Sequence, residues 1–289
     1  MFEMIGDFFS KLIAEMCRNG LENIFNNINA TAENIGDELG TNPADYNPAI
    51  FSILERLSET VILPIAGMIL TVVIMINLFN TILDERERKD PFELYIKFFL
   101  KTTIAVLLTT NAFKITNYIL EMGQGIVGKA IQVLNNDAVI NLNENLDTFQ
   151  AFLETLSVGK TILIGLTLFI TFIIIWIIHI LSYVVILGRF IEIFMRISLS
   201  PLAFSTFFSR EFNGIGFNFI KGMIAITIQA FLIMVVIALY KGMLLNLVVD
   251  ISTEESLNLF LIQILATSIT LIFSLFQTNR IANSIFNAS

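Results

Sequence analysis

Five stretches of the chain are apolar for long enough to cross a lipid bilayer. A hydrocarbon core of about 30 Å requires about 20 apolar residues of helix, and a window of about 19 residues finds them. The expected spans are residues 60–83, 102–120, 161–187, 222–245 and 257–278. The pattern predicts an all-α, polytopic helical membrane protein with about five transmembrane helices, whose membrane domain comprises residues 60–289.

An amphipathic helix is predicted before the first span, within an external region of residues 1–59. Apolar residues recur at helical spacing over residues 2–28, with charged residues elsewhere around the helix and Gly20 as the point where it could break. Residues 29–49 are rich in Asn, Asp, Gly and Pro and are expected to form a linker. The helix either lies flat on the outer leaflet or offers a surface to sister subunits or partners, and both interpretations stay open.

The distribution of Lys and Arg predicts the orientation in the membrane. With the N-terminus outside, residues 84–101, residues 188–221 and the C-terminal tail face the cytoplasm and hold ten of the 17 basic residues. Short cytoplasmic loops carry an excess of Lys and Arg. We therefore expect an external N-terminus, an external loop at residues 121–160 and a cytoplasmic C-terminus.

The third span is the uncertain part of this assignment. Residues 161–208 would form about 72 Å of helix, which is too long for one crossing. Six spans would place Arg189, Glu192 and Arg196 inside the membrane, at roughly 2.5 to 3.5 kcal/mol for each central arginine. We favour five spans, with the helix continuing past the inner surface, these three residues forming local ion pairs, and residues 188–221 forming a cytoplasmic amphipathic segment.

The composition agrees with a lipid environment and argues against several kinds of binding site. Hydrophobic residues make up 55% of the chain, above the roughly 45 to 50% of soluble domains. Only 15% of residues are charged, with an acidic excess, so composition indicates no nucleic-acid surface. One cysteine permits no intramolecular disulfide, and one histidine without an HExxH motif argues against a metal site.

Candidate motifs for catalysis and nucleotide binding are weak. Residues 123–130 satisfy G-x-x-x-x-G-K but end in alanine instead of a hydroxyl residue, and a second stretch ending at Thr161 has Glu154 where the first glycine belongs. There is no G-x-S-x-G motif. His179 lies in the third span and is interpreted as a neutral imidazole bonded to a neighbouring helix, with a functional role as the alternative. We therefore expect no enzyme activity and no cofactor.

Uncharged polar residues recur at helical spacing in two spans. Such stripes usually mark helix packing, and a water-lined path is the alternative. The residues concerned are Thr103, Thr110 and Asn117 with Lys114 in the second span, and Gln263, Thr267, Thr270 and Ser274 in the fifth.

The region after the third span resembles a known family. It reads Arg196-Ile197-Ser198-Leu199-Ser200-Pro201-Leu202-Ala203-Phe204, followed by Phe207-Phe208 and a stretch that ends at Lys221-Gly222. This is similar to the signature of TrbL-type conjugal transfer proteins, the family of the sixth VirB component. Six residues are interpreted as an inner-face motif for structure or assembly: Arg196, Ser200, Pro201, Leu202, Ala203 and Phe204. Pro201 is expected to end a helix, and Gly214 and Gly216 to loosen the next turn.

The resemblance implies a function and partners. Members of that family are polytopic inner-membrane subunits of type IV secretion systems. Such a subunit is implied to form homo-oligomers in the bacterial cytoplasmic membrane and to help build a translocation path for DNA and protein. Its partners would be the lipid bilayer, other secretion subunits, their cytoplasmic ATPases and, transiently, the transported DNA or protein.

Two other functions compete with this one, a component of a solute transporter or permease and a membrane assembly scaffold. A transporter should carry charges or broken helices near the middle of the membrane. Here the proline lies at the expected inner edge, which disfavours a transporter.

Overall fold

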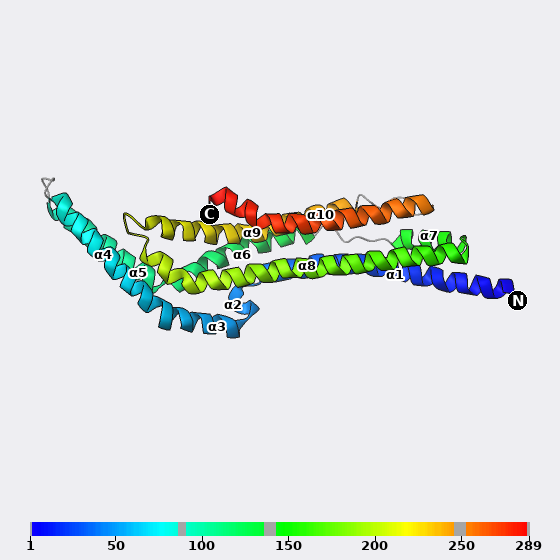
Figure 1. Ribbon diagram of the computed structural model, residues 1–289, viewed down its shortest axis with the longest axis horizontal. Coiled ribbons are helices and arrows are strands. Elements are labelled where there is room, and N and C mark those ends of the chain that lie inside the picture. The colour runs from blue at the N-terminus through cyan, green and yellow to red at the C-terminus, as the bar shows by residue number, and fades with distance from the viewer. Residues whose placement is uncertain (1, 86–90, 136–142, 246–252, 288–289) are drawn as a thin grey trace. The chain divides into compact units, whose positions relative to one another are not determined.

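The structure is a computed structural model that describes residues 2–85, 91–135, 143–245 and 253–287. These residues form helices and turns without a β-strand, which confirms the expected all-α fold (Figure 1). In chain order the elements are α1 (Phe2–Gly40), α2 (Pro43–Tyr46), α3 (Pro48–Leu57), the π-helical turn η1 (Ser58–Ile62), α4 (Leu63–Glu85), α5 (Pro91–Thr110), α6 (Ala112–Asn135), α7 (Asn143–Glu154), α8 (Val158–Ser205), α9 (Asn213–Leu245) and α10 (Glu254–Phe286).

The chain divides into two compact units. Unit 1 comprises residues 1–39, 129–186 and 232–277, and unit 2 comprises residues 40–128, 187–231 and 278–289. Both units therefore draw on segments that lie far apart in the sequence. The expected division into an external region 1–59 and a membrane domain 60–289 concerns placement in the bilayer and stays a prediction.

In unit 1, helix α1 lies along the first part of α8 (Figure 1). The thiol of Cys17 contacts the backbone carbonyl of Thr161 at 3.9 Å, and a Cβ at Gly165 would lie 3.1 Å from the Cys17 sulfur. An ion pair joins Arg18 to Asp147 of α7 at 3.1 Å. The rings of Phe25 in α1 and Phe260 in α10 stack with centroids 6.1 Å apart. The apolar face of α1 thus packs against its own chain.

The prediction of a linker at residues 29–49 was wrong over its first part, which belongs to α1. The helix is also unbroken at Gly20. The helix continues to Gly40 because Ile35 and Leu39 are buried and Gly36 lies against Met234, so tertiary packing outweighs the weak helix propensity of Asn and Gly. The two Asn-Pro pairs mark helix starts, with Asn42 and Asn47 as N-caps and a proline in the first turn of α2 and α3.

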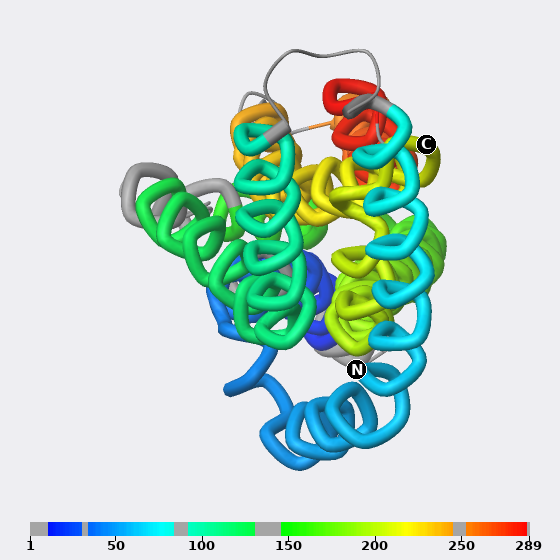
Figure 2. Tube along the Cα trace, turned by 90° about the vertical axis from the view of Figure 1, so that its left-hand side faces the viewer, coloured from blue at the N-terminus to red at the C-terminus, as the bar shows by residue number. Residues whose placement is uncertain are grey.

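In unit 2, helices α4 and α5 lie side by side (Figures 1 and 2). The core of this unit joins α6, α8 and α9 through six buried residues, against which Phe51 also packs: Phe113, Leu120, Ile193, Ile197, Met223 and Ile226. Apolar residues of the second and fourth expected spans therefore pack against the end of α8, while many other apolar residues stay exposed on the helix surfaces as lipid contact would require.

Four helices of the described chain are long and apolar enough to cross a membrane. They are Pro48–Leu83, Val158–Ser205, Asn213–Leu244 and Glu254–Phe286, which cover four of the five expected spans and confirm a polytopic helical protein. The remaining span, residues 102–120, is interrupted between α5 and α6 at Asn111. The Asn111 side chain donates to the Leu107 carbonyl at 2.9 Å, a local bond that competes with the regular helix. The assignment of residues 102–120 as a span stays a prediction.

Residues 188–221 comprise the end of α8, a short turn and the start of α9, and their assignment as a cytoplasmic amphipathic segment stays a prediction. The expectation that Pro201 ends a helix was wrong, because α8 continues to Ser205. Its continuation beyond residue 187 agrees with the long third helix of the five-span interpretation, while the side of the membrane stays a prediction.

Cysteine labelling will test the orientation. Ile215 is 55% exposed, so a cysteine there should react unless the membrane protects it. In a Cys17→Ser background, an external maleimide should label Asp250→Cys, a position outside the described residues, and spare Ile215→Cys. Both positions should react in lysed cells. External labelling of Ile215→Cys would instead require six spans.

Candidate functional site

The inner-face motif occupies the last turns of α8, where a hydroxyl compensates for its proline. Pro201 has no backbone N–H, so the Ile197 carbonyl, four residues earlier, loses its usual helix partner. The Ser200 hydroxyl donates to that same carbonyl at 2.7 Å, and Ser200 is fully buried. An unpaired carbonyl in an apolar interior is costly. The Ser-Pro pair can therefore remain helical.

Two more hydroxyls bond backward along the chain where α8 ends. Ser205 donates to the Leu202 carbonyl at 2.7 Å, and Thr206 donates to the Ala203 carbonyl at 2.8 Å. Ser209 accepts from the backbone N–H of Phe212 at 3.1 Å. The turn between α8 and α9 thus satisfies several of its polar groups locally.

Two glycines let the start of α9 approach the end of α8. A Cβ at Gly216 would lie 3.0 Å from the Ala203 carbonyl oxygen and 2.9 Å from the Phe207 ring, and one at Gly222 would lie 2.2 Å from an Arg196 nitrogen. Gly216 therefore serves close packing inside a helix, and the expectation that it loosens a turn was wrong. Gly214 is helical too, with nothing near its Cβ position.

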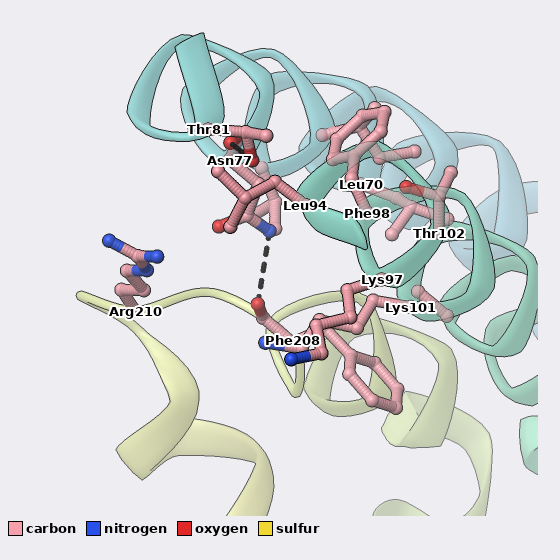
Figure 3. A pocket seen from close by; sticks show the side chains of 13 residues that line it. Leu70, Asn77, Thr81, Leu94, Lys97, Phe98, Lys101, Thr102, Phe208 and Arg210 are labelled. Carbon is pink, nitrogen blue, oxygen red and sulfur yellow. Dashed lines mark hydrogen bonds between the residues drawn. The ribbon is translucent and has the colours of Figure 1, made fainter. Parts of the chain in front are cut away.

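Aromatic rings fill the contact between these two helix ends. The centroids of Phe204 and Phe219 lie 6.1 Å apart, and those of Phe207 and Phe217 lie 4.4 Å apart. The Phe208 carbonyl accepts a hydrogen bond of 3.0 Å from the Asn77 amide of α4 (Figure 3). These contacts join the motif at the end of α8 to α4 and α9 of unit 2.

The charged residues near the motif follow the expected pattern in part. Arg196 binds Glu192 through two nitrogens, at 2.8 and 3.0 Å, which confirms that ion pair. Arg189 is 6% exposed; its Nε donates to the Ile226 carbonyl at 3.4 Å, and its guanidinium lies 5.8 Å from the Phe190 ring centroid. The Tyr46 ring stacks on the Phe190 ring, with the two centroids 3.9 Å apart. Arg189 therefore ties α8 to α9.

A groove of about 530 Å³ opens beside the motif. It is lined by Arg196 and Leu202 of α8, by Asn218 and Gly222 of α9, and by Ile69 of α4. The polar groups present are a guanidinium already paired with Glu192, the Asn218 amide and the Thr206 hydroxyl, which donates to the Ala203 carbonyl, and the other lining side chains are apolar. This set suits packing against another helix.

The polar stripe expected in the second span is divided between two helices. Thr103 and Thr110 are exposed on α5 and donate to carbonyls of their own helix, Phe99 and Val106, each at 2.9 Å. Lys114 is exposed on α6, where Asn117 donates to Glu121 at 2.7 Å. Glu121 also accepts from Asn42 at 3.4 Å. These residues thus link α6 to the start of α2, and a role as path lining stays a prediction.

The stripe in α10 also bonds mainly to its own helix. Thr267 donates to the Gln263 carbonyl at 2.9 Å, Thr270 donates to the Ala266 carbonyl at 2.8 Å, and Ser274 is half-buried. The polar contact between helices uses the neighbouring Ser268, which shares a 2.8 Å hydrogen bond with Tyr240 of α9. The sequence analysis did not predict this pair. The only hint was that Ser268 directly follows Thr267 of the predicted polar stripe.

His179 lines a small cavity in unit 1 together with other polar side chains. The cavity, of about 230 Å³, also contacts Asn34, Asp37, Glu38 and Tyr183. No group of three metal-ligating side chains occurs among the residues that the structure describes. One carboxylate oxygen of Glu38 is buried without a hydrogen-bond partner there, and burial raises the pKa of Glu38.

Glu38 should make the stability of the protein depend on pH. Because its folded-state pKa is raised, its penalty is absent below the ordinary glutamate pKa of about 4.3 and appears as pH rises through the folded-state pKa. Glu38→Gln removes this penalty. Between about pH 4 and pH 7, its melting temperature in detergent should therefore fall less than that of the wild type. Equal slopes for the two proteins would contradict this.

One glycine of the weak nucleotide motif, Gly123, has a packing role instead. Residues 123–130 lie inside α6, so their backbone N–H groups form helix bonds and cannot cradle a phosphate. A Cβ at Gly123 would lie 1.7 Å from the Thr227 methyl carbon of α9. Gly123 thus marks a close crossing of α6 and α9.

These features together define a class of protein. Long apolar helices, buried hydroxyls bonded to backbone and small residues at crossings are typical of polytopic helical membrane proteins.

Residues 28–201 match the model of the TrbL/VirB6 plasmid conjugal transfer like protein family, and the chain belongs to that family. The match includes Arg196, Ser200 and Pro201 and ends before Leu202. No curated protein and no solved structure matches. The resemblance seen in the sequence is confirmed, and the protein is a multi-pass membrane component of conjugal transfer.

Proposed function

We propose that this protein is a non-enzymatic subunit of a conjugative type IV secretion channel that helps to form the path for DNA and protein across the cytoplasmic membrane. The family match over residues 28–201 carries this proposal. The subunit would act as a homo-oligomer with other secretion subunits, and cytoplasmic ATPases would supply the energy.

The chemistry around the motif supports assembly as its role. The ends of α8 and α9 present the groove at Arg196, aromatic rings and bonded hydroxyls, all of which serve packing. Exposed apolar side chains on α4 and α8 provide surface for lipid and for neighbouring subunits, with Met68 and Leu163 more than 60% exposed. Such a surface suits a subunit within a membrane complex.

Deletion of the gene from its native element tests the role in conjugation. Transfer frequency should fall to the background of the mating assay and return when the wild-type chain is supplied in trans. Uptake of small solutes should stay unchanged. Unchanged transfer would contradict the proposal, and lost solute uptake with normal transfer would favour the transporter alternative.

Formaldehyde crosslinking during mating separates a channel subunit from a scaffold. DNA of the transferred strand should co-precipitate with the tagged full-length protein in cells whose secretion ATPases are active. The signal should disappear when those ATPases are inactive. Normal assembly and transfer without any crosslinked DNA would favour the scaffold alternative.

A further inference from the structure

Helix α1 has one continuous polar face. Seven exposed residues recur every three or four positions from Glu15 to Asp37, so they lie along one side of the helix. The opposite side holds buried apolar residues, among them Leu21, Ile24 and Ile28. We refer to the exposed side as the polar face; it consists of Glu15, Asn19, Asn23, Asn26, Ala30, Asn34 and Asp37.

The apolar side of α1 is occupied within unit 1. Cys17 lies against Gly165 of α8, where an added Cβ would be 3.1 Å from its sulfur. Phe25 stacks on Phe260 of α10. A helix that lies flat on a bilayer must bury its apolar side in lipid. Because α8 and α10 already cover that side, α1 is poorly suited to rest on the outer leaflet.

Helix α1 also runs beside the most apolar part of α8 (Figure 1). Cys17 and Gly165 line one cavity between the two helices, of about 440 Å³, and Asn34 lines another with His179. The 17 steps from Cys17 to Asn34 cover about 26 Å at 1.5 Å each, close to the hydrocarbon core of about 30 Å. Residues 161–187 carry no Asp, Glu, Lys or Arg and form the expected third span. The two helices therefore share one depth in the membrane.

The polar face cannot contact lipid at this depth. Asn19, Asn23 and Asn26 are exposed there, and hydrocarbon offers no hydrogen-bond partner to their amides. Exposed residues of α8 at the same levels, such as Ile170 and Ile180, are apolar and suit lipid. The two neighbouring helices thus present different surfaces, α8 to lipid and α1 to water.

Water is also needed at the inner end of this helix pair. One carboxylate oxygen of Glu38 is buried without a hydrogen-bond partner among the described residues. It borders the cavity that Asn34 and His179 line, whose volume is about 230 Å³. Since one water molecule occupies about 30 Å³ of liquid, the cavity has room for several, and they would satisfy this oxygen.

A membrane position for α1 keeps the expected sides of both chain ends. The region from α3 to α5 begins and ends near the same end of α8, because Tyr46 before it stacks on Phe190 and Phe113 after it shares a buried cluster with Ile197. This region therefore adds no net crossing. Helix α6 then leads to α7, whose Asp147 lies beside α1 again. The N-terminus and the 121–160 loop thus stay outside, and the C-terminus stays cytoplasmic.

We propose that the polar face of α1 lines a water-filled path through the membrane, with other subunits completing the wall. Residues 17–34 would then lie inside the membrane, in place of the external position that the sequence alone predicted. The inference deepens the proposed function by naming residues of the path, and it rests on that function only for the cargo. Most of the lining consists of uncharged amides, which would let DNA pass without the tight phosphate binding that Lys and Arg produce.

Cysteine accessibility in native membranes tests the proposal. In a Cys17→Ser background, Asn26→Cys should react with a charged, membrane-impermeant methanethiosulfonate, because the reagent attacks the thiolate and needs water. Ile170→Cys, at a similar depth on α8, replaces a side chain that is 50% exposed. It should react at least about tenfold more slowly, because lipid keeps its thiol protonated. Asn19→Cys and Asn34→Cys should react as Asn26→Cys does.

The control on the buried side of α1 is Ile24→Cys, which should not react in the folded protein. Reaction there as fast as at Asn26→Cys would mean that α1 does not pack by its apolar side. Equally slow reaction at Asn26→Cys and Ile170→Cys would mean that protein or lipid covers the polar face, and equally fast reaction would mean that α8 is not in lipid there. Each of these results would overturn the proposal.

Labelling does not require DNA transfer, so the two proposals can fail separately. A labelled polar face, together with unchanged transfer after gene deletion, would refute the role in secretion and leave the water-filled path. Lost transfer with an unlabelled polar face would overturn the path along α1 alone.

Discussion

Replacing Ser200 by alanine should lower the free energy of unfolding by about 1 to 3 kcal/mol, the cost of leaving a buried polar group unpaired. Pro201 gives no N–H to the Ile197 carbonyl, and the Ser200 hydroxyl is the donor that replaces it at 2.7 Å. Alanine removes that donor from a fully buried position. Denaturation of the purified protein in mixed micelles measures the loss, and conjugative transfer should fall with it.

The proline provides the test of this explanation. Pro201→Ala restores a backbone N–H that can bond the Ile197 carbonyl, so Ser200→Ala should cost less than about 1 kcal/mol in that background. Ser198→Ala is the matched control, because the Met195 carbonyl that Ser198 contacts at 2.9 Å keeps its ordinary helix donor. Equal losses for Ser200→Ala with and without Pro201 would show that the hydroxyl does not compensate for the proline.

The elements that the sequence predicted well are those with a strong period. The apolar face of α1 and four of the spans follow from spacing and length, since burial in lipid or protein demands a continuous apolar surface. The Glu192–Arg196 pair also followed from spacing, because residues four apart on a helix are neighbours.

The errors arose where contacts of buried groups outweigh the usual preference of a residue type. Turn-forming residues suggested a linker after residue 28, yet Ile35 and Leu39 bury themselves and keep α1 helical. Pro201 suggested a helix end, yet the hydroxyl beside it supplies the missing donor. Local sequence rules cannot detect such compensation, because both cases require knowledge of which group is buried and which residues it contacts.

The candidate site was predicted in its residues and not in its contacts. The motif from Arg196 to Phe204 was recognised in the sequence, but its approach to α9 depends on Gly216 and Gly222 meeting α8 across a turn. The cavity that Lys97, Lys101 and Arg210 line (Figure 3) likewise joins segments about 110 residues apart and has no local signature in the sequence.

Gly123→Ala should destabilise the protein by about 1 to 3 kcal/mol through overpacking at the crossing of α6 and α9. The new methyl carbon would lie 1.7 Å from the Thr227 methyl carbon and 3.1 Å from its Cβ. Thr227 cannot rotate away freely, since its hydroxyl donates to the Met223 carbonyl at 2.8 Å and its χ1 angle is restricted by branching. The helices must separate, or the hydroxyl must give up its bond.

Thr227→Ser removes the colliding methyl and keeps the hydroxyl, so it should restore most of the stability that Gly123→Ala loses. Gly125→Ala and Gly128→Ala are matched controls in the same helix, because nothing lies within 4 Å of either Cβ position. Their better helix propensity should leave stability unchanged or raise it by up to about 1 kcal/mol. Equal destabilisation at all three glycines would mean that the segment needs glycine for its backbone, as a phosphate-binding loop would, and would refute the packing role of Gly123.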